Sequence, residues 1–297
     1  MPSFLKLRRL LPALALLCTA FSLSGCDYAL MDPKGPIGLE ERNIILLATG
    51  LMLIVVVPVI GMTIAFAWRY RSGNEKAEYK PEWEHSNAIE VVVWVVPCLI
   101  IAALATVTWT SSHSLDPYRP IASEKAPVEV EVVSLDWKWL FIYPDLKIAS
   151  VNELAFPAGT PVHFRMTSGS VMNTLFVPQL GSMVYTMAGM QTQLSLLADR
   201  QGSFEGISSN FSGDGFSDMK FFAKSMSDDD FQGWVEHARA GGAVLSSAVY
   251  HELEKPSEKV PVAYYGDIDP MVFHEALGMM GMSTASAASV PAAEKGM

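Results

Sequence analysis

The sequence predicts a two-helix transmembrane hairpin, followed by an all-β sandwich and a short α-helical C-terminal extension. Two long stretches without charge lie in the first 112 residues, and each is long enough to cross about 30 Å of hydrocarbon. Short apolar or alternating runs separated by turn residues come next, and this pattern is typical of a β-sandwich. Beyond residue 226 the pattern becomes helical.

The composition agrees with a membrane protein. Of the 297 residues, 50% are hydrophobic and 18% are charged, and the mean hydropathy of +0.26 is high for a soluble chain. The net charge of −10 argues against a nucleic-acid partner, because phosphates demand a basic face. The three cysteines are Cys18, Cys26 and Cys98, so a domain beyond the second stretch cannot carry a disulfide.

Residues 1–25 have the features of a secretory signal that is removed on export. A basic start precedes an apolar run from Leu10 to Phe21, as such signals require. The following Leu23-Ser-Gly-Cys26 resembles the bacterial lipoprotein signal, in which the cysteine thiol takes a diacylglycerol before cleavage. Cys26 is therefore expected to be lipidated and to begin an exported segment, 26–42. The alternatives are a secretory peptide with a chance cysteine and an uncleaved first membrane helix.

Residues 43–68 and 88–112 are predicted to be the two transmembrane helices. Each contains one proline, Pro58 or Pro97, which suggests a kink that neighbouring helices tolerate. The loop between them, 69–87, carries four basic residues. The positive-inside rule therefore makes this loop cytoplasmic. The chain then returns to the outside after the second helix, in agreement with the export signal.

Residues 113–226 are predicted to form the exported sandwich. The runs that predict its strands are Val128–Val133, Trp137–Tyr143, Ala149–Phe156, Pro161–Met166, Gln191–Leu197 and Met219–Phe222. Residues 227–282 are predicted to form a helical, aromatic-containing extension. Its first helix starts at three acidic residues from Asp228, which the helix dipole favours, and a second helix covers Ser246 to Glu254. Residues 283–297 are rich in Ala and Ser and are predicted to be disordered.

The aromatic run from Ser134 to Pro144 carries a family resemblance. With two N-terminal spans and an exported sandwich, it resembles subunit II of the haem–copper terminal oxidases, and specifically the quinol oxidase branch of cytochrome bo type. Other motifs that fit this branch are His85-Ser-Asn87, Trp109, Leu115-Asp-Pro117-Tyr118 and Ala263-Tyr-Tyr265. The resemblance covers nearly all of the mature chain. It implies a cupredoxin-like sandwich and a place in a proton-pumping complex that oxidises ubiquinol and reduces dioxygen to water.

Copper-bearing relatives hold a two-copper centre in this sandwich, and bridging thiolates are its chemical requirement. The resemblance implies that other residues occupy the ligand positions. In place of His, Cys, Glu, Cys and His, these are Asn173, Ile207, Ser209, Phe211 and Gly215, with Phe216 as the alternative for the last position. Only Met219 survives as a ligand type, and the exported domain has no cysteine. The copper centre is therefore expected to be lost. We expect this chain to bind no metal or other cofactor and to have no catalytic centre of its own.

The resemblance also implies the partners and the location. Haems, copper and ubiquinol are expected in the catalytic subunit I, with electrons entering from quinol and not from cytochrome c. Smaller subunits III and IV and membrane lipid complete the expected partners. The chain is expected to be a multi-pass protein of the bacterial inner membrane, with its C-terminal domain in the periplasm.

Glu90 is the candidate for proton entry. It opens the second predicted span seven residues before Pro97, a spacing at which the family has a glutamate at the cytoplasmic mouth of a proton channel. A carboxylate at a membrane entry is costly unless it faces water or a partner, and the alternative is a snorkelling interfacial residue. Trp137, Trp139 and Tyr143 are expected to pack the domain and to dock it on the catalytic subunit.

Two other functions are compatible with the sequence. The chain could be a membrane-anchored periplasmic cupredoxin-like binding or assembly lipoprotein without oxidase activity, or it could be subunit II of a menaquinol oxidase. Two full spans argue against the first, because one lipid or one helix is enough for a simple tether. Co-purification of haem with a large multispan subunit distinguishes the oxidase from the lipoprotein.

Overall fold

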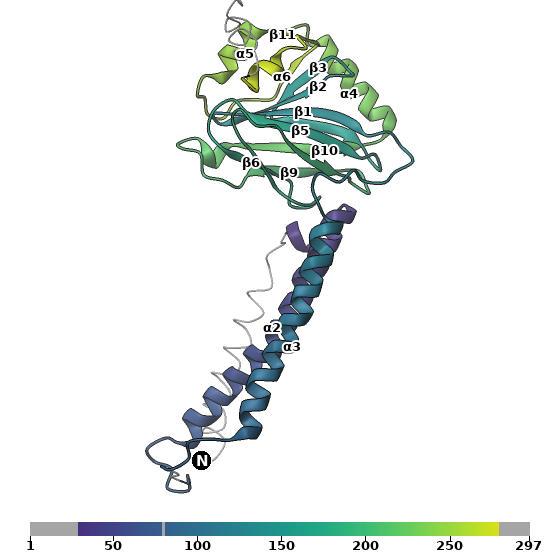
Figure 1. The fold of residues 1–297 in the computed structure, drawn as a ribbon. Coiled ribbons are helices and arrows are strands. Elements are labelled where there is room, and N and C mark those ends of the chain that lie inside the picture. The colour runs from purple at the N-terminus through teal and green to yellow at the C-terminus, as the bar shows by residue number, and fades with distance from the viewer. Residues whose placement is uncertain (1–28, 79–80, 279–297) are drawn as a thin grey trace, which may run out of the picture.

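The computed structural model describes residues 29–78 and 81–278. A β-sandwich lies at one end, and two long helices extend away from it (Figure 1). The predicted signal peptide (1–25), Cys26 and the predicted tail (283–297) lie outside the described residues.

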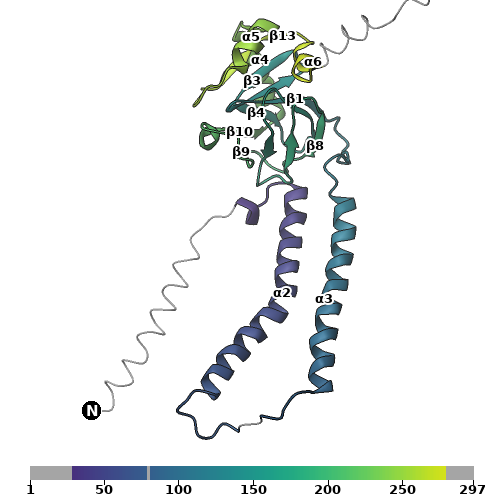
Figure 2. The ribbon, with the colours of Figure 1, turned by 60° about the vertical axis from the view of Figure 1, so that its left-hand side comes forward.

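Both long helices have the length and the apolar composition needed to cross a membrane. Helix α2 spans Pro36–Arg69 and helix α3 spans Asn87–Ser114. Helix α2 begins before the predicted span of 43–68 because its first position is a proline, which is preorganised for a helix start. Pro58 and Pro97 lie inside α2 and α3. Figure 2 shows the two helices apart over much of their length.

The N-terminal end of α2 is attached to the sandwich by backbone contacts. A short 3-10 helix, η1 (Ala29–Met31), precedes it. The Lys34 amide donates to the Gln179 carbonyl at 2.7 Å. A Cβ atom at Gly35 would lie 2.1 Å from the Leu197 carbonyl oxygen, so only glycine allows this approach. The first helix is therefore fixed to the domain.

Two sheets face each other in the sandwich. The first has the strand order β12-β3-β2-β1-β5-β8 and the second has the order β4-β10-β9-β6-β7. The strands are β1 (Val128–Leu135), β2 (Lys138–Tyr143), β3 (Ile148–Val151), β4 (Glu153–Pro157), β5 (Val162–Ser168), β6 (Asn173–Phe176), β7 (Val184–Thr186), β8 (Thr192–Leu196), β9 (Gly202–Ser208), β10 (Lys220–Met226) and β12 (Ala263–Tyr265).

The single strand predicted over Ala149–Phe156 is wrong. The structure divides it at Asn152 into β3 and β4, which belong to different sheets. Asn152 has a φ of 57°, a left-handed conformation that asparagine tolerates better than most residues. Its side chain accepts from the Trp139 amide and donates to the Val260 carbonyl, both at 2.8 Å. These bonds hold the crossing point between the sheets.

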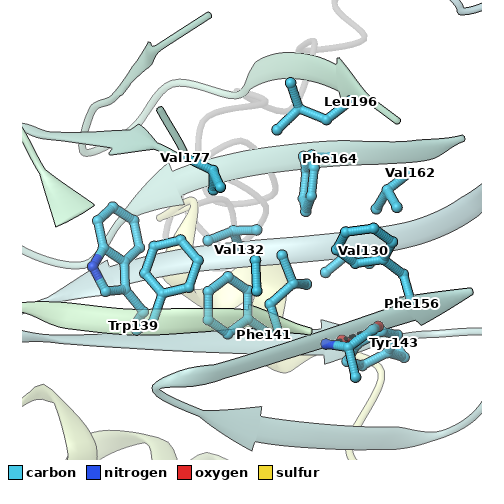
Figure 3. Close-up of a cluster of buried hydrophobic side chains, with 14 of the residues drawn as sticks. Val130, Val132, Trp139, Phe141, Tyr143, Phe156, Val162, Phe164, Val177 and Leu196 are labelled. Carbon is cyan, nitrogen blue, oxygen red and sulfur yellow. Dashed lines mark hydrogen bonds between the residues drawn. The ribbon is translucent and has the colours of Figure 1, made fainter. Parts of the chain in front are cut away.

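Strand β2 is buried on both faces. Trp139, Phe141 and Tyr143 point into the inner core between the sheets (Figure 3). Leu140 and Ile142 point to the opposite face and belong to a second core. Since side chains alternate along a strand, an unbroken apolar run indicates that both faces are covered. The inner core and this outer core are therefore separated by a single sheet.

The C-terminal extension supplies the outer cover. Helix α4 (Asp228–Ala240) packs against the inner core, whereas α5 (Ser247–Glu254) and α6 (Val272–Ala276) contribute to the outer core. A small parallel pair, β11 (Val244–Leu245) with β13 (Asp267–Ile268), lies among them. Strand β12 pairs with β3 at the edge of the first sheet. The predicted boundary at residue 226 therefore divides segments that share one sheet.

Candidate functional site

The structure places Asn173, which the resemblance implies at the first ligand position, close to the loop that follows β9. Asn173 is fully buried, and its Oδ1 accepts from the Ser208 hydroxyl at 3.1 Å. The Asn210 side-chain amide donates to the Met172 carbonyl at 2.9 Å. Hydrogen bonds between neutral groups therefore hold the region where the resemblance implied a metal.

The remaining side chains of this region do not fit a two-copper centre. Phe211 is 76% exposed and lies edge-on to Phe216, with ring centroids 5.5 Å apart. The Ser209 hydroxyl donates to the Met183 sulfur at 3.1 Å. Within residues 29–78 and 81–278, no group of three or more His, Cys, Asp or Glu could hold a metal ion. An amide, a hydroxyl and the buried thioether of Met219 offer no bridging thiolate.

Gly215, which the resemblance implies at the second histidine position, lies directly against Trp137. A Cβ atom at Gly215 would be 2.5 Å from Cδ2 of the indole and 2.8 Å from Cγ of Glu258. The indole Nε1 donates to the Ser212 carbonyl at 3.1 Å, which fixes the ring over the loop. The indole therefore occupies the space that a ligand side chain would need.

The three aromatic residues singled out in the sequence have different surroundings. Trp139 and Tyr143 have no exposed surface. The Tyr143 hydroxyl donates to the carbonyl and accepts from the amide of Ala155, both at 2.9 Å, and burial raises its pKa. These two residues pack the core. Trp137 is partly exposed, so only this member of the set presents a surface to a partner.

A buried carboxylate that the sequence reasoning missed connects the extension to the sandwich. Oε1 of Glu153 accepts from Trp234 Nε1 at 2.8 Å and from the Tyr264 hydroxyl at 2.6 Å. Its Oε2 lies 2.5 Å from Lys224 Nζ. Burial alone would raise the pKa of Glu153, but these donors outweigh it and hold the pKa below its ordinary value. Burial and the neighbouring carboxylate raise the pKa of Tyr264 to about 12.

Lys138 makes a second polar connection. Its side chain is almost fully buried, and its Nζ donates to the carbonyls of Asp136 and Lys255 at 2.9 Å and to the Ser257 hydroxyl at 2.6 Å. Burial lowers the pKa of Lys138, and the charge of Asp136 opposes this shift. A lysine next to two tryptophans was a visible signal in the sequence, but two of its three acceptors, on Lys255 and Ser257, lie more than 100 residues away.

Glu90 lies in the first turn of α3, at the end of the helix that is remote from the sandwich (Figure 2). Its Oε1 is 2.9 Å from Nδ1 of His85. The His85 ring also contacts the side chain of Asn87. Both members of the Glu90–His85 pair are more than half exposed within this single chain. A carboxylate and an imidazole therefore meet where the predicted cytoplasmic loop enters the second span.

Comparison with known proteins matches both parts of the domain. Residues 144–226 match the family described as cytochrome c oxidase subunit II, periplasmic domain, and residues 239–281 match the COX aromatic-rich motif. The chain is 58% identical over 257 residues to cytochrome bo(3) ubiquinol oxidase subunit 2 of Pseudomonas aeruginosa, which covers 86% of this chain and 78% of that protein. The chain belongs to the ubiquinol oxidase subunit 2 family.

Other relatives agree with this membership. Ubiquinol oxidase subunit 2 of Acetobacter aceti is 52% identical over 260 residues, covering 87% of this chain and 84% of that protein. Quinol oxidase subunit 2 of Bacillus cereus is 37% identical over 257 residues, covering 86% and 87%.

Membership in the ubiquinol oxidase subunit 2 family makes this chain part of a haem–copper oxidoreductase complex. Such a subunit associates with a subunit I, and the two apolar helices and the periplasmic-domain match fit an inner-membrane protein. The family predicted from the aromatic run is confirmed. The predicted fold class is also confirmed, with two apolar helices, a cupredoxin-like sandwich and C-terminal helices.

Proposed function

We propose that this chain is the non-redox subunit of a proton-pumping quinol oxidase that oxidises ubiquinol and reduces dioxygen to water. The observation that carries the proposal is the donor set around Asn173 and Gly215, which offers no thiolate and no imidazole. Electrons therefore do not pass through this sandwich from cytochrome c. The haems, copper and ubiquinol belong to subunit I, which this chain covers on its periplasmic side.

The two helices support a multi-pass anchor and a clamp on subunit I. Their apolar side chains are exposed in the single chain, as Ile64 and Leu99 illustrate. Such surfaces are stable only against lipid or other apolar helices. We assign these faces to membrane lipid, subunit I and the smaller subunits III and IV. The sandwich is fixed to α2 at Gly35. It then lies at the periplasmic surface of the inner membrane.

Purification of the tagged chain from its own membranes tests this proposal. We expect haem and a large multispan subunit to co-purify, with quinol-dependent oxygen consumption. A colourless chain without a multispan partner would contradict the proposal and favour the binding or assembly lipoprotein. Turnover of the purified complex with ubiquinol and with menaquinol distinguishes a ubiquinol oxidase from a menaquinol oxidase.

Glu90 is proposed to admit protons from the cytoplasmic side. The support is its position at the start of α3 and its contact with His85, since a carboxylate and an imidazole can pass a proton between them. We expect Glu90→Ala to reduce turnover and proton pumping in reconstituted vesicles. Glu84→Ala, an exposed carboxylate in the same loop, is the matched control. Unchanged turnover and pumping in Glu90→Ala would contradict this role.

Cys26 is proposed to carry a diacylglycerol as an additional anchor. The support is the Leu23-Ser-Gly-Cys26 motif and the two membrane-capable helices that follow it. Intact-mass measurement of the mature chain is expected to give a lipidated N-terminus at Cys26. An unmodified N-terminus at another residue would contradict it. Because two helices already anchor the chain, Cys26→Ala is expected to leave it in the membrane.

A further inference from the structure

Three methionines, Met172, Met187 and Met190, flank the end of the β6–β7 hairpin. Strands β6 and β7 are antiparallel, with Asn173 opposite Thr186. Continued by one residue, this register would place Met172 opposite Met187. Asn173 and Thr186 are both fully buried. Since alternate residues point to opposite faces, Met172 and Met187 point outward, and Met172 is 43% exposed.

Met190 joins this pair across a tight turn. Met187 and Met190 form an antiparallel bridge, and the Met190 amide donates to the Met187 carbonyl at 3.2 Å. Gly189 has a φ of 73°, which allows this tight turn. Directly opposed residues project to the same face with Cβ atoms about 4.5–5.5 Å apart. Met187 therefore has a methionine on each side, and Met190 is 52% exposed.

Exposed strand positions ordinarily carry polar residues, so three adjacent thioethers on this face need an explanation. A thioether is a soft, polarizable ligand on an unbranched side chain with three rotatable bonds. Soft sulfur ligands select Cu(I) over the harder divalent ions. Three such flexible groups on neighbouring positions are able to turn toward one ion.

We propose that Met172, Met187 and Met190 form a surface site for a single Cu(I) ion. The site differs in ligands and in face from the former two-copper positions, because Asn173 points inward while the methionines point outward. It has no anionic ligand, so we expect the bound ion to exchange readily. The site does not depend on the proposed oxidase role, and the two are tested separately.

The direct test is an anaerobic titration of the full chain in detergent with Cu(I) against a competing bicinchoninate chelator. We expect one Cu(I) per chain, with sulfur-only coordination by X-ray absorption. Replacing one thioether, as in Met187→Leu or Met190→Leu, is expected to weaken binding about tenfold or more. Met271→Leu is the control, because Met271 is also exposed but lies at the start of α6.

A second measurement needs no variant. With methyl-labelled methionine, addition of Ag(I), a soft redox-inert substitute, is expected to shift three methyl resonances and leave that of Met271 in place. Absence of Cu(I) binding, or Cu(I) binding unchanged in the triple leucine variant, would overturn the site.

An apolar docking surface for another protein is the competing explanation, and leucine separates the two. Leucine keeps the apolar volume of methionine but removes the sulfur. If the wild-type chain binds no Cu(I), and the oxidase assembles with the triple leucine variant but not with Met187→Asp, the patch is a docking surface and the copper proposal is wrong.

Discussion

Different interactions stabilise the packing on the two faces of the first sheet. On the inner face, aromatic rings dominate: the Phe141 and Phe221 centroids are 5.0 Å apart, and the Trp139 and Phe221 centroids are 5.7 Å apart. On the outer face, Leu140 packs against the C-terminal helices in the second core. The extension is fixed in addition by charged groups that the sandwich buries, Lys138 and Glu153.

The apolar inner core therefore determines the shape of the sandwich, whereas the buried charged groups determine where the C-terminal extension attaches. Apolar contacts are non-directional, so the inner core can keep a cupredoxin-like sandwich without a metal. Buried charged groups are costly unless they are fully paired. A buried charged group is therefore stable only when its hydrogen-bonding partners are in position. Around Glu153 these partners include Trp234 and Tyr264, which come from the C-terminal extension.

Truncation of β2 side chains on its two faces is the strongest test of this contrast. Phe141→Ala should destabilise the domain by about 3–5 kcal/mol, because it leaves a cavity in the aromatic core. Leu140→Ala, on the opposite face, should cost about 2–3 kcal/mol and should release the extension before the sandwich unfolds. Urea denaturation followed by tryptophan fluorescence, together with hydrogen exchange of residues 244–277, measures both effects.

Phe222→Ala is the matched control, since Phe222 lies on β10 but is half exposed. A small effect is expected for this variant. If Leu140→Ala and Phe141→Ala unfolded the sandwich and the extension together and to the same extent, the two faces would form one cooperative unit and the contrast would fail.

Glu153→Gln tests the polar attachment. The change keeps an acceptor for Trp234 and Tyr264 but removes the charge opposite Lys224, and we expect a loss of about 2–3 kcal/mol. Since the folded-state pKa of Glu153 is lowered, its contribution is present above the ordinary pKa of about 4.3 and is lost as the pH falls through the folded pKa. The stability difference between wild type and variant should therefore shrink in acid.

The control for that measurement is Glu205→Gln. Glu205 also pairs with a lysine, Lys220, at 2.7 Å, but both side chains are more than half exposed. Exposed pairs contribute little, so this variant should stay close to wild type at every pH. A pH-independent difference between wild type and Glu153→Gln would show that the carboxylate charge is not what holds the extension.

The contrast also explains which features could be predicted from the sequence. The start of α4 was predictable from the acidic residues that begin at Asp228, and the structure adds caps from Ser227 on α4 and Ser246 on α5. The break at Asn152 was not, because an asparagine in an apolar run can continue a strand or turn left-handed. The role of Glu153 was also hidden, since its partners come from β10, α4 and β12. Interactions between residues close in sequence can be predicted from one sequence, whereas pairings between distant segments cannot.

Gly215→Ala probes the point where the loop before β10 contacts both the sandwich and the C-terminal extension. Its Cβ would press on Trp137 of the sandwich and on Glu258 of the extension, and overpacking of this size costs about 1–2 kcal/mol. Thermal unfolding of Gly215→Ala, of Trp137→Ala and of the double variant measures the coupling. We expect the cost of Gly215→Ala to fall when the indole is absent. Gly233→Ala, an open helical position in α4, should instead stabilise slightly.

The smallest expected effect concerns His251, which connects the two outer helices. Its Nδ1 lies 2.8 Å from Glu254 and its Nε2 lies 2.9 Å from Glu275, and both ring nitrogens donate only when the imidazole is protonated. The hydrogen bond to Glu254 is the main cause that raises the pKa of His251; desolvation opposes it, and the Glu275 charge adds to the rise.

Because the folded-state pKa of His251 is raised, its contribution is fully present below the ordinary pKa of about 6.5 and is lost as the pH rises through the folded pKa. His251→Gln should therefore lower the melting temperature slightly in mild acid and not at alkaline pH, with faster hydrogen exchange confined to α5 and α6. The sign is opposite to that of Glu153: acid weakens the attachment through β4 but strengthens the contact between α5 and α6. An equal effect of His251→Gln at both pH values would therefore place its contribution in packing and not in charge.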